Sequence, residues 1–476
     1  MVTTAERQLR RAFRAGTLLD LTGAARTVVR AEFLAGLLLD GPGAAGGRIA
    51  RVDLAGAHIT GRLDLTGARI DTPLRLRRCV FDEKVRLDHA DLVSLNLDGS
   101  VLPGIEAEAV RVATGFRLRD ARIAGDAWLP QARVDGTMEL DRSTVGGTVD
   151  LQRAVIGGGL HLREGVRIDG GIKLGGSRVG TDLSLTHARI GSTGGAWAVA
   201  GAGLHVGGAL LGHRLHADGG VNLIGAQLGG GVAFHDCVLR RPDGYALLLI
   251  EAQARLLTLR PAAGSAGTIS LRDAHFGRVV DDPVTWPADC RIELDGLTYD
   301  RLTRRSEDVA EWTARQRLAW MARYSAGFSP GPYDQLAAAL RRDGREQEAR
   351  QVMLVRERLR HQTMGRLGAA WGAVQNVGIG FGYHPVRALL WLVAVIAAGT
   401  CWFAVTGPLR AVKAGEAPTW DPFLYTLDVL VPLVDLGHDK AWDPVGADKA
   451  VTLTIMAIGW ILATTVVAGA GRALRR

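Results

Sequence analysis

Apolar residues recur along the first two thirds of the chain in units of eleven residues. In LSLTHARI (183–190) apolar and polar residues alternate, and a small residue then precedes the last apolar one; LDLTGARI (63–70) and FRLRDARI (116–123) have the same order. Successive units begin eleven residues apart, with one step of twelve, at Phe116, Ala127, Met138, Val149, Leu160, Ile172 and Leu183. Alternation with a period of two is typical of short strands that bury one face.

Two such units, about 22 residues, are long enough to close one coil of a solenoid. Stacked coils would place equivalent side chains above one another at the ~4.8 Å spacing of paired strands, so that leucine, isoleucine and valine form continuous interior columns. The pattern therefore predicts a mainly β fold, a right-handed parallel β-helix solenoid over residues 47–302. The repeat becomes irregular over 192–222, where we expect a longer loop.

Residues 1–46 precede the repeat and are predicted to form an N-terminal helical cap. TVVRAEFLAGLLLDG (27–41) has apolar residues at helical spacing and ends in glycine. A helix over the first coil would cover strand edges that could otherwise pair with another chain.

Residues 303–366 differ in composition from the repeat and are predicted to form a helical bracket. The stretch from 333 to 362 has the pattern of two helices joined near Gly344, with apolar residues at the spacing of one tetratricopeptide-like hairpin. A single hairpin is too short to form an array. We therefore expect this C-terminal helical hairpin to pack on the end of the solenoid.

Residues 367–476 contain two apolar runs, over 385–405 and 450–471, that we predict to be transmembrane helices. Each has about 20 residues, enough to cross the hydrocarbon core of a bilayer. The apolar segment 421–437 between them is too short to cross and is predicted to be re-entrant or interfacial. The arginines near the two runs are Arg356, Arg358, Arg360, Arg366, Arg472, Arg475 and Arg476. The positive-inside rule then predicts a multi-pass protein of the cell membrane with the solenoid and both termini in the cytoplasm.

RAEFLAGLLLDG (30–41), followed by AHITGRLDLTGARI (57–70), resembles actinobacterial membrane-associated proteins with pentapeptide-like β-helices. The resemblance covers nearly the whole chain and implies the same solenoid and membrane association. Members of that family are sometimes labelled oxidoreductases, but no residue of this sequence supports that activity.

Composition narrows the classes of function. Glycine is frequent, with 62 residues among 476, while 47% of the chain is apolar, which favours a turn-rich β fold over disorder. The four cysteines are widely spaced and form no disulfide or zinc-ribbon pattern. The net charge of +8 would suit nucleic acid, but the solenoid has few aromatic residues for stacking, so no specific nucleic-acid partner is predicted.

Few residues are candidates for chemistry, and no catalytic or cofactor-binding residue is predicted. His213 and His235 are 22 residues apart, one coil, and His216 and Cys237 are near them in sequence. These four are candidate ligands of a transition metal. Histidine is, however, a common outward residue on such a ladder, so we predict no metal and no cofactor.

Asp428 and Asp435 fall within the segment 421–437. A carboxylate at membrane depth is costly and suggests a function. We favour the alternative that both carboxylates lie at the interface, in water or paired with Lys440.

We therefore expect a membrane-anchored, non-catalytic cytoplasmic scaffold that presents a surface to a protein or to the lipid bilayer. The order of span, half-helix, loop and span also resembles the pore module of potassium-type channels, although VPLVDLG (431–437) stands where the selectivity filter belongs. A channel-like or sensor protein regulated by the solenoid is thus the alternative, and an enzyme is the third. A homo-oligomer formed through the membrane region is compatible with each.

Overall fold

The computed structural model describes residues 2–41, 49–282, 286–303, 312–325, 327–363, 385–413, 418–431 and 436–474. These residues divide into two compact units, Met1–Gln335 and Leu336–Arg476, and each unit is described by itself.

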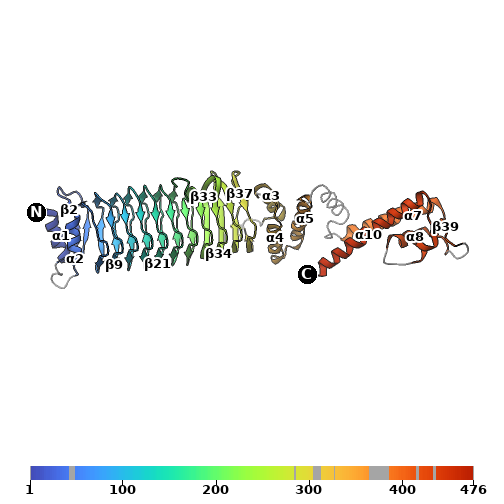
Figure 1. The fold of residues 1–476 in the computed structure, drawn as a ribbon, viewed down its shortest axis with the longest axis horizontal. Helices are drawn as coiled ribbons and strands as arrows, with labels where there is room; N and C mark the ends of the chain where they lie inside the picture. The colour runs from blue at the N-terminus through green and yellow to red at the C-terminus, as the bar shows by residue number, and fades with distance from the viewer. Residues whose placement is uncertain are drawn as a thin grey trace. The chain divides into compact units, whose positions relative to one another are not determined.

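The first unit is a parallel β-solenoid of about 11 turns with about 22 residues per coil (Figure 1). Its coils run from β3 (Asp53–Ala55) to β38 (Thr298–Thr303), and each strand pairs in parallel with the equivalent strand one coil later. Phe116, for example, pairs with Leu95 on one side and with Met138 on the other. The predicted parallel solenoid with about 22 residues per coil is confirmed.

The coils change character along the chain. From β4 (His58–Thr60) to β32 (Val221–Asn222) every strand has two to four residues. The later strands are longer: β33 (Gln227–Leu248), β34 (Gln253–Pro261), β35 (Ala266–Ser270), β36 (His275–Asp281) and β37 (Cys290–Glu293). The pairing of β33 with β34 contains register shifts, one of them between His235 and Cys237. The later coils therefore pair over longer strands, and the step from Gln227 to its partner Gln253 is 26 residues instead of 22.

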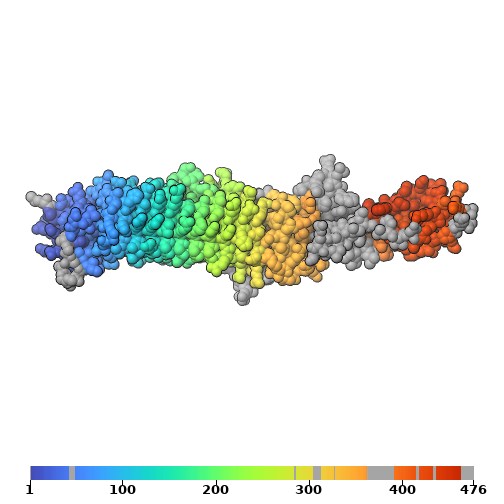
Figure 2. Space-filling view, turned by 60° about the horizontal axis from the view of Figure 1, so that its bottom comes forward, coloured from blue at the N-terminus to red at the C-terminus, as the bar shows by residue number. Residues whose placement is uncertain are grey.

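The interior of the coils is filled by their own side chains. Leu118, Leu140 and Leu162 on successive coils have no exposed surface, and Ala121 occupies a tight inner corner without exposure. The buried hydroxyl of Ser100 donates to the carbonyl of Leu76 at 2.8 Å, so a polar residue at such a corner is satisfied by the neighbouring coil. On the face shown in Figure 2 the coils follow one another in chain order without a gap.

Two corners of each coil turn through a residue with a left-handed backbone. At one of these corners the residues from 120 to 236 stack from coil to coil and are not glycine: Asp120 (φ 56°), Arg142 (φ 60°), Glu164 (φ 59°), His187 (φ 60°), Arg214 (φ 52°) and Asp236 (φ 53°). A non-glycine residue with positive φ is uncommon and marks a tight turn. The turn directs each of these side chains and the one before it outward, and so creates two adjacent columns of polar groups.

The N-terminal segment adds strands as well as helices to the first coil. β1 (Leu19–Asp20) pairs with β3 and β2 (Val28–Arg30) pairs with β4, next to α1 (Thr4–Ala15) and α2 (Ala31–Asp40). The stretch 27–41, predicted as a helix, therefore begins as a strand.

An ion pair with a buried carboxylate joins α1 to β2. Glu6 caps α1 together with Thr3 and contacts Arg30 at 2.8 Å. Burial by itself raises the pKa of Glu6, but hydrogen bonds from Arg30 and Thr3 outweigh it and lower the pKa to about 2.

Helix α3 (Ala314–Tyr324) covers the last coils. Trp286 packs edge-on against Trp320 with ring centroids 5.2 Å apart, and Arg317 reaches the buried Asp281 at 2.6 Å. Burial raises the pKa of Asp281 despite this partner. α4 (Pro330–Arg342) follows, and the side-chain amide of Gln335 donates to the carbonyl of Tyr299. Both ends of the solenoid are thus covered by helices.

The second unit contains most of the remaining elements. They are α5 (Glu346–Thr363), α7 (Pro385–Thr406), β39 (Arg410–Ala411), α8 (Pro422–Leu430), α9 (His438–Ala441), β40 (Trp442–Asp443) and α10 (Ala447–Leu474). Phe403 of α7 and Ile455 of α10 are buried in one cluster with Tyr425 of α8. Glycine permits this close packing, because a Cβ atom at Gly459 of α10 would lie 2.0 Å from the carbonyl oxygen of Leu430.

The prediction of two transmembrane helices, over 385–405 and 450–471, is wrong. Among the residues that the structure describes, no helix combines the length and the hydropathy needed to cross a bilayer. The two apolar runs lie in α7 and α10, where several of their side chains pack around α8. An apolar run in a sequence does not reveal how many of its residues pack against another helix.

Candidate functional site

Opposite charges alternate along the two corner columns in the narrow coils. In the first column Arg119 contacts Asp98 at 2.7 Å, and Arg163 contacts Asp141 at 2.7 Å. In the second column, which is formed by the left-handed residues, Arg142 lies between Asp120 and Glu164 and is ion-paired to both. Each corner charge therefore meets an opposite charge one coil away.

The same columns contain other residue types in the coils that lead into β33. Backbone hydrogen bonds continue the first column through Thr186, His213 and His235, and strand pairing places Arg260 after His235. The second column continues through His187 and Arg214 to Asp236. Two histidines thus occupy adjacent coils at positions that hold an aspartate and an arginine earlier in the chain.

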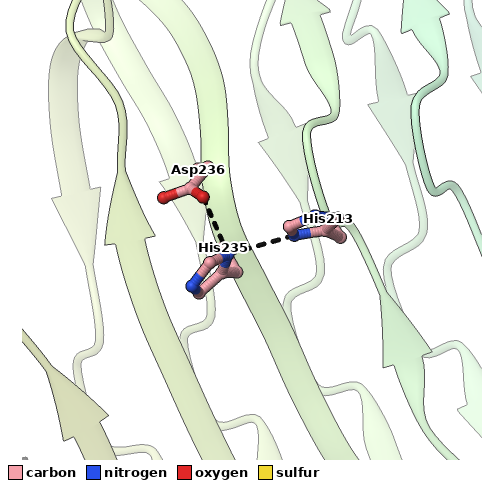
Figure 3. A group of neighbouring side chains, drawn as sticks. All are labelled: His213, His235 and Asp236. Atoms are coloured by element: carbon pink, nitrogen blue, oxygen red, sulfur yellow. Dashed lines mark hydrogen bonds and ion pairs between the residues drawn. The ribbon is translucent and has the colours of Figure 1, made fainter. Parts of the chain in front are cut away.

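His213, His235 and Asp236 come together at this corner (Figure 3). The Nδ1 atom of His235 lies 3.0 Å from Nδ1 of His213 and 3.1 Å from Oδ2 of Asp236. The two imidazole rings are 5.0 Å apart and tilted by 32°, and His187 meets the His213 ring edge-on at 5.7 Å. One nitrogen of His235 therefore faces both of the other groups.

Arg260 closes the other side of His235. Its Nη1 atom contacts Nε2 of His235, and its Nη2 atom lies 3.8 Å from Oδ1 of Asp236. A guanidinium can only donate, so Nε2 of His235 must accept, and the proton of the neutral ring then belongs on Nδ1. That Nδ1–H can donate to His213 or to Asp236. The cluster as it stands is thus a hydrogen-bonded chain with a defined tautomer.

The cluster is only partly shielded from solvent. The side chains of His235 and Arg260 are 15% and 14% exposed, whereas that of Asp236 is 45% exposed. Small ions can therefore reach the carboxylate, while the imidazole of His235 is held by its neighbours.

The structure brings together two of the four predicted candidate ligands. His216 begins β31 (His216–Asp218) and faces solvent in another column, paired with Arg189 on the preceding coil. Cys237 points into the interior with no exposed surface, and burial raises the pKa of its thiol well above the usual range. Neither is a member of the cluster.

Asp236 and Arg260 are the members that the sequence did not indicate. Asp236 joins because the left-handed turn directs it outward beside its neighbour. Arg260 comes 25 residues after His235, so a strict 22-residue spacing does not find it.

Asp428, a candidate for a carboxylate at membrane depth, has a structural role. Its buried carboxylate accepts backbone N–H groups of Leu436 at 2.7 Å, of His438 at 2.8 Å and of Asp439 at 2.9 Å. These bonds fix the chain that leads into α9 and satisfy the carboxylate without a ligand. Asp435 lies outside the described residues.

The predicted basic residues are only partly described. Arg356, on α5, is half-buried and contacts Glu357, while Arg358 and Arg360 on the same helix are exposed. Arg472 falls in the last turn of α10. Arg366, Arg475 and Arg476 lie outside the described residues.

A further outward column combines apolar and basic side chains. Strand pairing aligns Val80, Val101, Arg122, Thr144, Arg167 and Arg189 on successive coils. We call these six residues the valine–arginine column. Val80 and Val101 are 45% and 37% exposed, and Arg167 and Arg189 are direct neighbours of like charge.

Comparisons with protein-family models, with curated proteins and with solved structures find no match for this chain. The resemblance to membrane-associated β-helix proteins stays a prediction.

Proposed function

We propose that the chain is a non-catalytic scaffold whose solenoid binds an acidic protein along the valine–arginine column. The observation that carries this proposal is that the inward and outward side chains of each coil have separate roles. Inward side chains fill the cylinder, as the unexposed Leu118 and Leu140 illustrate, and outward side chains repeat in register over many coils. Solenoids with such surfaces bind partners along their length.

The charge of the column supports an acidic partner. Arg167 and Arg189 occupy paired positions, and like charges at directly opposed positions destabilise a sheet. Arg167 has an ion pair with Asp169 at 2.8 Å, whereas no ion pair of Arg122 or Arg189 is found among the described residues. A carboxylate-rich partner surface would relieve this repulsion and gain charge-assisted hydrogen bonds.

Two adjacent exposed valines distinguish this column from a parallel column that also combines valine and arginine. Strand pairing aligns that parallel column as Asp91, Arg111, Arg133, Val155 and Arg178. There Asp91 stands directly before Arg111 and offsets its charge, and Val155, 39% exposed, is a single valine between two arginines. The valine–arginine column instead ends in Val80 and Val101, which are paired with each other. Apolar groups next to arginine are typical of protein interfaces.

Site-specific photo-cross-linking tests the proposal. A photoreactive amino acid at Thr144, between Arg122 and Arg167, should give one dominant protein adduct in the cells that make the chain. Reversing Arg122, Arg167 and Arg189 to glutamate should reduce that adduct at least about tenfold, because three attractive contacts become repulsive.

The matched control reverses Arg111, Arg133 and Arg178, which carry the same total charge in the parallel column. This control should leave the adduct at Thr144 unchanged. Equal loss in both triple variants would mean that net charge alone attracts the partner, and an absent adduct would refute the interface.

A further inference from the structure

We propose that His213, His235 and Asp236 bind one divalent transition-metal ion of the zinc type. This site is independent of the valine–arginine column and adds a ligand to the proposed scaffold. It lies where the alternation of charges in the corner columns is replaced by two histidines.

The donor set and its dimensions fit such an ion. Two imidazole nitrogens and one carboxylate are a common set of protein ligands for a site that keeps an open position. Bonds of about 2.0–2.1 Å in a tetrahedral site separate neighbouring ligand atoms by about 3.3 Å. The observed separations from His235 Nδ1 are 3.0 Å to His213 and 3.1 Å to Asp236, and the three ligand atoms lie within 4.8 Å of one another. Only a small rotation of the exposed Asp236 is needed to complete the site.

The backbone holds the two histidines in place before any ion arrives. The N–H of Arg214 donates to the carbonyl of His235 at 2.9 Å, and the N–H of His187 donates to the carbonyl of His213 at 2.8 Å. Both imidazoles therefore project from a rigid ladder, which lowers the entropic cost of bringing ligands together.

Arg260 competes with a metal ion for the imidazole of His235. In the neutral cluster its guanidinium donates to Nε2 of His235 and leaves the ring proton on Nδ1. Coordination at Nδ1 moves that proton to Nε2, so the ring stays neutral and no proton is lost. Nε2 then becomes a donor and can no longer accept from Arg260, so the guanidinium has to turn away. Metal binding and the Arg260 contact are consequently exclusive.

This exclusion distinguishes a metal site from a purely structural hydrogen-bond cluster. Arg260→Gln removes a positive charge and supplies a carbonyl oxygen that can accept from Nε2–H, as a carbonyl or carboxylate behind a metal-bound histidine usually does. This variant should bind metal at least about tenfold more tightly than the unaltered chain. Arg260→Lys retains the charge and should bind no more tightly than the unaltered chain.

The measurement is titration of the tag-free full chain with Zn²⁺ by calorimetry and with Co²⁺ by visible absorption. The unaltered chain should bind one ion and give the Co²⁺ spectrum of a nitrogen- and oxygen-ligated site. His213→Ala and His235→Ala should each weaken binding more than about 100-fold, because each removes a ligand atom, and Asp236→Asn about tenfold. His216→Ala should leave affinity unchanged, since that residue belongs to another column.

Two results would overturn the assignment. One is a lack of stoichiometric binding in the Arg260→Gln variant while circular dichroism shows an intact solenoid. The other is binding that survives both His213→Ala and His235→Ala, which would place the ion elsewhere.

Discussion

The coils before residue 190 and those after it share one kind of interior but differ at one corner. Leu140 in the first region and Leu215 in the second are both completely buried. At the corner, Asp141 and Arg163 form an ion pair in the first region, whereas His213 and His235 meet in the second. The inward positions therefore determine the coil, and the residue types in an outward column can differ without altering the fold.

The corner also shows what a wider coil permits. In the narrow region the 22-residue step brings each charge next to its opposite, and the column is neutralised. In the wider region the step from His235 to Arg260 is 25 residues, and Arg260 reaches across the imidazole to the neighbourhood of Asp236. A longer coil thus assembles groups that a strict repeat would keep apart.

The largest predicted effect tests whether the two interiors are equivalent. Leu140→Ala and Leu215→Ala should each lower the free energy of unfolding by about 2–5 kcal/mol, because both remove a buried side chain and leave a cavity. Chemical denaturation of the two variants measures this. A much smaller loss for Leu215→Ala would mean that the coils after residue 190 are packed more loosely than those before it, and the two interiors would not be equivalent.

An intermediate effect is expected at the ion-paired corner. Asp141 accepts the backbone N–H of Arg163 at 2.9 Å and its Nη2 at 2.7 Å. Burial alone would raise the pKa of Asp141, but these hydrogen bonds outweigh it and hold the pKa below its usual value. Asp141→Asn should therefore lower the free energy of unfolding by about 1–2 kcal/mol at pH 7.

The pH dependence of this difference has a definite sign. A carboxyl whose pKa is lowered by folding contributes stability above its unfolded pKa and loses it as the pH falls through its folded pKa. Denaturation at a series of pH values should show the stability difference between the unaltered chain and Asp141→Asn constant near neutrality. It should decline only below about pH 4. A difference that stays the same in stronger acid would exclude the ion pair as its source.

The smallest effect is expected when the histidines at this corner are replaced by the charged residue types that Asp141 and Arg163 represent earlier in the chain. The double variant His213→Asp, His235→Arg should change the free energy of unfolding by less than about 1 kcal/mol, because partly exposed ion pairs contribute little. It should also abolish Zn²⁺ binding. A variant that fails to fold would show that the histidines are needed for the coil itself.

The solenoid could be predicted because its interior imposes a pattern that the sequence must repeat. Each apolar residue at an eleven-residue step has a partner one coil away, as Leu95, Phe116 and Met138 do. Outside the repeat this information is lost. The strand β2 at Val28–Arg30 has no repeat of its own, and its pairing with β4 follows only from the packed first coil.

The two apolar runs show a different limit. Hydropathy along the chain counts apolar residues but does not show what they contact. Phe403 and Ile455 lie against Tyr425 of α8, a short helix outside both predicted spans. The pattern therefore predicted the helices, but among the described residues neither has the length and hydropathy needed to cross a bilayer.

The candidate site could be predicted in part. The 22-residue interval brought His213 and His235 together, as stacking requires. Proximity in sequence was misleading for Cys237, because the left-handed turn at Asp236 separates an outward histidine from an inward cysteine. Arg260 depends on a register shift in β33, which composition and spacing do not indicate.

The measurement that tests the in-register columns most directly is disulfide trapping, in a chain whose exposed Cys401 is replaced by serine. Strand pairing aligns Thr144 with Arg167 before residue 190 and His205 with Gln227 after it. Cysteines introduced at either pair should oxidise to an intramolecular disulfide, since paired strands about 4.8 Å apart meet the geometric requirement.

Cysteines at Thr144 and Arg189, two coils apart, should stay reduced under the same oxidation. Mass spectrometry of the digested chain distinguishes these outcomes. The account predicts cross-links only within the two aligned pairs, and a cross-link between positions 144 and 189, with none between 144 and 167, would contradict it.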